Sequence, residues 1–140
     1  MIRLMQLEDF TQLQALWEPE DMRYSLEGFQ DLLARNPQTC FVYQEGQRIL
    51  GAACGTYDGR RAMLRSVAVL PEARGRGLGK QLVRAVLVAF QGQGLYAIRL
   101  HVMADNAAGI ALYESLGFEA HLDVLYMGLN LPTPADSFCC

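Results

Sequence analysis

The sequence predicts an α/β fold in which helices cover both faces of a central mixed β-sheet. Two observations carry this prediction. Residues 64–70 form an apolar run that ends at Pro71, and a glycine-rich turn then leads into a segment with apolar residues at every fourth position. A second apolar strand and a short helix are expected over residues 96–102 and 106–116, so strand and helix alternate along this half of the chain.

The first third of the chain is expected to add one strand and two helices. Residues 2–5 resemble a short strand, and a helix opens at residues 7–9 and is broken by the Pro19 segment. Ser25 is a plausible N-cap for the second helix, because its hydroxyl can accept a hydrogen bond from a free amide of the first turn. Asn36 and Pro37 are expected to end that helix.

Three strands should follow, over residues 39–43, 49–57 and 61–70. Turn signals separate them at residues 45–47 and at Asp58-Gly59. Beyond the long helix, residues 92–94 form a turn, and Gly117 is the natural C-cap of the short helix. Residues 118–121 and 124–129 are expected to pair as two closing strands. We therefore predict one domain over residues 1–131 and a C-terminal tail over residues 132–140.

Composition narrows the function classes. The chain has 140 residues, of which 51% are hydrophobic, enough for one buried core, and a net charge of −3, which argues against general binding of nucleic acid. No signal peptide and no apolar run long enough to cross a membrane is recognised. Cys40 and Cys54 are expected to be reduced core thiols, the adjacent Cys139 and Cys140 have no assigned role, and no cysteine or histidine spacing suits a metal. A cytoplasmic protein without a membrane partner is expected.

Positive charge and glycine are concentrated in one loop, residues 74–80. Its glycines allow close approach of the backbone to a ligand, and the first amides of the following helix lack intrahelical partners. A diphosphate is the natural ligand. The spacing differs from that of a P-loop and from the dinucleotide-binding pattern. The residues are Arg74, Gly75, Arg76, Gly77, Leu78, Gly79 and Lys80.

Two motifs resemble those of the GNAT superfamily of CoA-dependent N-acetyltransferases. Arg74-x-x-Gly77-x-Gly79 is similar to the glycine-loop signature of that superfamily, and residues 106–118, from Asn106 through Leu112-Tyr113 to Leu116-Gly117-Phe118, are similar to its second signature. The order of elements agrees with the same fold over about residues 1–130. The resemblance is strongest to small single-domain bacterial members, including those similar to ribosomal-protein alanine N-acetyltransferases.

The resemblance implies a cofactor, acetyl-CoA, and a place for it. The pantetheine arm would lie between the two parallel central strands and contact Val67, Ala68 and Val69. The pyrophosphate would bind amides of residues 74–80. Asn106 would reach the pantetheine arm, and the Tyr113 hydroxyl would lie near the thioester sulfur.

The resemblance also implies roles in catalysis. Tyr113 suits the acid that protonates the leaving thiolate, because a phenol is protonated at neutral pH. A helix aromatic packed in the core is the alternative. The base is less clear. Many family members carry a glutamate on the strand before the glycine loop, where this sequence has no carboxylate. Some carry a glutamate on the next strand, where this sequence has His101. A histidine can take the amine proton, directly or through water, but it can also be structural, and solvent can serve as the base.

The acceptor is expected to be a primary amine, and the sequence does not identify it. Specificity should depend on the first two helices and the hairpin loops, and the protein is expected to be a monomer or a homodimer. Two other functions stay open: a non-catalytic acyl-CoA sensor with the same fold, and a nucleotide-binding module. Candidate acceptor residues are Trp17, Tyr24, Glu27, Phe29, Tyr57 and Asp58.

Overall fold

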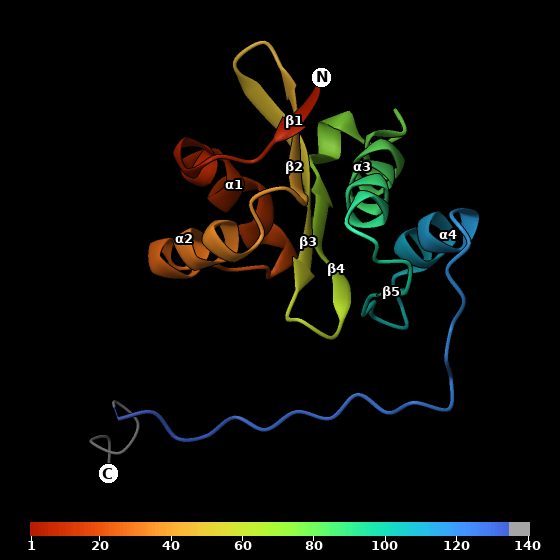
Figure 1. The fold of residues 1–140 in the computed structure, drawn as a ribbon. Helices are drawn as coiled ribbons and strands as arrows, with labels where there is room; N and C mark the ends of the chain where they lie inside the picture. The colour runs from red at the N-terminus through yellow and green to blue at the C-terminus, as the bar shows by residue number, and fades with distance from the viewer. Residues whose placement is uncertain (135–140) are drawn as a thin grey trace.

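The computed structural model describes residues 1–134, which form one sheet with helices on both faces (Figure 1). Helices α1 and α2 cover one face of the sheet, and α3 and α4 lie on the other. The expected fold class is therefore confirmed. In chain order the elements are β1 (Ile2–Leu4), α1 (Phe10–Trp17), α2 (Leu26–Arg35), β2 (Cys40–Glu45), β3 (Arg48–Tyr57), β4 (Ala62–Val69), α3 (Leu78–Gly92), β5 (Ile98–Arg99) and α4 (Ala107–Ser115).

The strands lie in the sheet in their order along the chain, β1-β2-β3-β4-β5. The first four pair antiparallel, and β5 pairs parallel with β4. The β4–β5 ladder has only two pairs, Ala62 with Ile98 and Met63 with Arg99. Beyond Met63, the edge of β4 that faces away from β3 therefore has no strand partner among the described residues.

Each face of the sheet has its own apolar core. Leu13, Trp17 and Phe29 pack beneath α1 and α2, and each is at most 1% exposed. On the opposite face, Val86 and Phe90 of α3 lie directly against the sheet and are fully buried. Because both faces are covered, β3 is buried over most of its length instead of alternating between buried and exposed residues.

Local signals in the first two thirds of the chain are confirmed. The Ser25 hydroxyl accepts a hydrogen bond from the Gly28 amide, and α2 ends before Asn36 as expected. Asp58 holds the β3–β4 turn by accepting hydrogen bonds from the amides of Arg60 and Arg61 at 2.8 and 2.7 Å. These features depend on neighbours in sequence, which is why the sequence alone predicts them.

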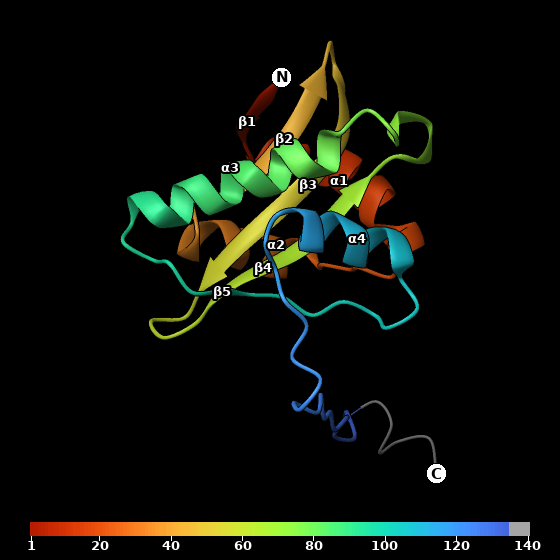
Figure 2. The ribbon, with the colours of Figure 1, turned by 90° about the vertical axis from the view of Figure 1, so that its right-hand side faces the viewer.

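The end of the sheet differs from the expectation. The strand expected over residues 96–102 shortens to Ile98–Arg99, and the closing strands expected over residues 118–121 and 124–129 are wrong. After α4 the chain leaves the body and runs past the end of the sheet (Figures 1 and 2). A strand needs a partner for its backbone N–H and C=O groups, and residues 118–129 pair with no strand among the described residues. The expected tail lies partly outside the described residues, with Cys139 and Cys140 among residues 135–140.

Candidate active site

The loop of residues 74–80 is a backbone cradle at the start of α3. Gly75 and Gly77 have φ angles of +84° and +77°, in the left-handed region that favours glycine. A Cβ built on either would meet no atom within 4 Å, so the space beside the backbone is open. Gly77 is the N-cap of α3 and has no side chain to satisfy the first amides. Among the described residues, no acceptor takes a hydrogen bond from the amides of residues 75–80.

Two of the three cations in this loop are already paired. Arg74 donates from Nη2 to Glu20 at 2.7 Å and from Nε to the Val69 carbonyl at 3.1 Å. Arg76 donates to Glu45 at 3.0 Å. The half-buried Lys80 forms no ion pair within the described part of the chain. The loop therefore offers more free backbone amides than free positive charge.

The loop lies beside the open edge of β4. A Cβ on Gly79 would lie 3.7 Å from Val69 of β4 and 3.5 Å from Leu112 of α4, so the start of α3 is close to both elements. Val67 and Val69 are half-buried and Ala68 is 7% exposed. The glycine loop and the unpaired part of β4 therefore form one continuous surface.

Helix α4 carries the two residues of the second motif. Asn106 is its N-cap, and Asn106 Oδ1 accepts a hydrogen bond from the Gly109 amide at 3.0 Å. Tyr113 is half-buried, and its ring lies 5.9 Å from that of Phe118. Burial raises the pKa of Tyr113 above the ordinary value for tyrosine. Its phenol therefore stays protonated throughout the neutral range.

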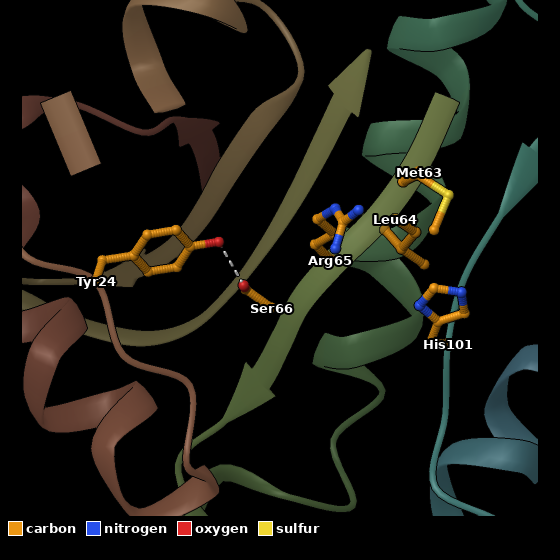
Figure 3. Close-up of a pocket in the computed structure, with 6 residues that line it drawn as sticks. All are labelled: Tyr24, Met63, Leu64, Arg65, Ser66 and His101. Carbon is orange, nitrogen blue, oxygen red and sulfur yellow. Dashed lines mark hydrogen bonds between the residues drawn. The ribbon is translucent and has the colours of Figure 1, made fainter. Parts of the chain in front are cut away.

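A polar cleft of about 190 Å³ opens where β4 separates from the chain that follows β5 (Figure 3). Tyr24 lies on one side of β4 and His101 on the other. The ring of Tyr126, from the segment after α4, lies 5.2 Å from the His101 ring. The cleft is lined by Tyr24, Met63, Leu64, Arg65, Ser66 and His101.

Ser66 gives this cleft its fixed geometry. Its φ of +55° is unusual for a residue other than glycine, and the β3–β4 register shifts at the same place. The indole of Trp17 donates to the Ser66 carbonyl at 3.0 Å, and the hydroxyls of Tyr24 and Ser66 are 2.9 Å apart. The pKa of Tyr24 is raised, mainly by burial. Such a strained backbone persists only where several contacts hold it.

The structure brings some expected residues together and separates others. Of the acceptor candidates, Tyr24 lines the cleft, whereas Trp17 and Phe29 are core residues. Tyr57 and Asp58 lie at the β3–β4 turn, and Glu27 is exposed on α2. Arg65 and Ser66 also line the cleft and were not among the residues predicted for the site. The signal that could have found them is this polar pair, which interrupts the apolar run of β4.

The described residues contain neither a cluster of metal ligands nor a membrane-spanning helix. No group of three histidine, cysteine, aspartate or glutamate side chains could hold a metal ion. None of the helices in residues 1–134 is both long and apolar enough to cross a membrane.

Comparisons with known proteins agree on one family. Residues 2–118 match the family model described as acetyltransferase (GNAT) family. "Acetyltransferase SG1711" of Sodalis glossinidius is 31% identical over 134 residues, covering 93% of this chain and 94% of that protein. The structure of Ard1 from Thermoplasma volcanium superposes with a TM-score of 0.78 at 26% identity, covering 85% of this chain and 82% of that one. The ribosomal-protein-S18-alanine N-acetyltransferase of Escherichia coli gives 0.73 at 26% identity, covering 85% and 77%.

Proposed function

Because this chain belongs to the acetyltransferase (GNAT) family, we propose that it transfers an acetyl group from acetyl-CoA to the nitrogen of a primary amine. One observation of the structure supports this most directly. The backbone amides of residues 75–80 donate no hydrogen bond to any described residue, and they lie beside the edge of β4 that β5 leaves unpaired. That combination suits a ligand with a diphosphate at one end and a peptide-like arm at the other.

The residues present fit acetyl-CoA. The amides of residues 75–80 and the Lys80 ammonium would hold the pyrophosphate, since Arg74 and Arg76 are engaged by carboxylates. The open edge of β4 at residues 67–69 would bond the amides of the pantetheine arm. Asn106 uses its carbonyl oxygen as a helix cap, and its NH₂ group, which donates to no other residue in the described part of the chain, would donate to that arm. Acetyl-CoA supplies the acetyl group already activated as a thioester.

Side chains of this protein would accept the proton of the amine and donate a proton to the leaving thiolate. His101, which lines the cleft, would accept the proton that the amine loses, directly or through one water. A backbone N–H near Val69 would stabilise negative charge on the carbonyl oxygen. Tyr113 would donate its phenolic proton to the leaving thiolate. Its raised pKa favours the protonated phenol before that step.

A non-catalytic acyl-CoA-binding protein is the second candidate. The observation that favours it is the composition of the cleft, whose lining includes no carboxylate to serve as a base. The two candidates share a cofactor and differ only in turnover.

The test is a thermal-shift titration with acetyl-CoA, CoA and ATP, followed by assay of CoA release with a panel of amines. A ligand at about 100 times its Kd stabilises the fold by roughly 2.7 kcal/mol, which raises the Tm by several degrees. We expect acetyl-CoA and CoA to raise the Tm and ATP not to. A shift without turnover of any amine would favour the sensor, and no shift would overturn both.

A substitution in the glycine loop checks where the cofactor binds. Gly77→Glu should abolish the shift, because it adds bulk and negative charge beside the free amides. Gly59→Glu is the matched control, since Gly59 also has a positive φ, +95°, and open space around it but lies in the β3–β4 turn. Equal loss of the shift in both variants would contradict the placement.

A further inference from the structure

We propose that the acceptor is an amino carboxylate, a primary amine with a carboxylate a few bonds away, and that Arg65 binds the carboxylate. This inference rests on the proposed function and specifies its substrate class. It is drawn from the charge and hydrogen bonding of the cleft that Tyr24, Arg65, Ser66 and His101 line.

Arg65 is the cation of the cleft, and its charge is unpaired within the described residues. Its Nε donates to the Thr56 hydroxyl at 3.2 Å, which holds the side chain along the sheet and leaves both terminal nitrogens free. In the view of Figure 3 the guanidinium lies over β4, between the Tyr24–Ser66 pair and His101. By contrast, several other arginines form ion pairs with carboxylates: Arg3, Arg23, Arg35, Arg48, Arg74 and Arg76.

A free guanidinium in a polar cleft selects for a planar anion. Its fixed fork of N–H donors matches the two oxygens of a carboxylate. A polyamine would instead bring further positive charge to Arg65, and no carboxylate of the lining would offset it. The adjoining hollow, of about 120 Å³, shares Tyr24 and contains Glu18 together with Arg23, so its charges balance.

The amine end has its own partners in the same cleft. The hydroxyls of Tyr24 and Ser66 share one hydrogen bond, so lone pairs stay available to accept from an amine N–H. The Trp17–Ser66 bond at 3.0 Å fixes the position of this pair. His101 lies across β4 from it. An amino carboxylate would thus have acceptors for its nitrogen and a cation for its carboxylate.

The experiment compares free amino acids with their primary carboxamides. The probes are glycine, alanine, β-alanine and γ-aminobutyrate, each beside its carboxamide, with spermidine as the polyamine. One readout is kcat/KM from CoA release. The other is calorimetry of the same compounds with CoA-saturated protein, which does not depend on turnover. The variants are Arg65→Gln and Arg65→Lys, and Arg61→Gln is the control, an exposed arginine of the same sheet end outside the cleft.

We expect at least one carboxylate to be preferred over its carboxamide by about ten- to hundredfold in kcat/KM, as for a hydrogen-bonded charge pair. Arg65→Gln should remove that preference by lowering the rate with the carboxylate more than the rate with the carboxamide, Arg65→Lys should restore part of it, and Arg61→Gln should keep it. A preference that survives Arg65→Gln, or faster transfer to spermidine, would overturn the inference while the proposed function stands. If acetyl-CoA binds and nothing is acetylated, the proposed function fails. Calorimetry then decides on Arg65: carboxylate binding lost in Arg65→Gln supports it, and its absence in the wild type overturns it.

Discussion

Tyr113 combines two properties that a proton donor needs. It lies on α4, whose Leu112 approaches the glycine loop, and burial raises its pKa. We expect Tyr113→Phe to lower kcat by about 10² or more, the usual contribution of a general acid, and to leave the thermal shift by acetyl-CoA unchanged. Because burial raises the pKa of Tyr113, loss of activity through deprotonation of this group should occur at a higher pH than for an ordinary tyrosine.

The control for that variant is Tyr96→Phe. Tyr96 is 76% exposed and precedes β5, so removal of its hydroxyl should change neither rate nor binding. A normal kcat in Tyr113→Phe would remove the acid assignment and return Tyr113 to a packing role against Phe118. A lower Tm without loss of rate would point to the same conclusion.

At the scale of elements, α3 packs closely against β3 at Gly55. A Cβ on Gly55 would lie 2.7 Å from Phe90 Cζ and 2.7 Å from Val86 Cγ1, far inside ordinary contact. Both side chains are fully buried, so neither can move aside without disturbing the core. Gly55→Ala should therefore lower the free energy of unfolding by about 1–3 kcal/mol in denaturant titrations.

Gly92 provides the comparison on the same helix. It is the last residue of α3, has no atom within 4 Å of a built Cβ and has no positive φ. Gly92→Ala should leave stability unchanged or raise it by up to about 1 kcal/mol, since alanine is the better helix former. Equal effects at Gly55 and Gly92 would mean that α3 is not packed against β3 as described.

The sequence could predict those elements whose ends are set by neighbouring residues, but not those that depend on a distant partner. Helix α2 begins at a serine cap and ends at Asn36, and β3 and β4 are joined by an Asp-Gly turn, so local chemistry sets these boundaries. Strand β5 and the expected closing strands have no such signal. Their apolar residues allow a strand, but whether a strand forms depends on a partner elsewhere in the chain.

Of the candidate site, one part could be predicted from the sequence and the other could not. The glycine loop could be predicted from the sequence because its function depends on backbone conformation, which Gly75 and Gly77 determine. The cleft could not be predicted, because Tyr24, Arg65 and His101 come from three separate segments. The register shift and the left-handed Ser66 lie where these segments meet, and neither can be recognised from the sequence.

At the scale of the whole molecule, the segment after α4 stands apart from the rest. The match to the family model ends at residue 118, and large apolar side chains beyond it are exposed, with relative exposures from 67% to 93%. Soluble domains rarely leave so much contiguous apolar surface uncovered. The exposed residues are Leu122, Val124, Leu125, Tyr126, Met127, Leu129 and Leu131.

We expect this segment to make the protein associate as its concentration rises. The sequence here is rich in residues that favour strands and has a single charge, Asp123, between Leu122 and Leu131. The double variant Leu125→Lys with Met127→Lys should shift the protein toward monomer in sedimentation velocity experiments across a wide range of concentration, because it places two charges on one side of the extended segment. Val88→Lys is the control, since Val88 is 67% exposed on α3, away from this segment. If the wild type stays monomeric at every concentration, the apolar side chains are covered within one molecule, and the double variant should then lower its Tm instead.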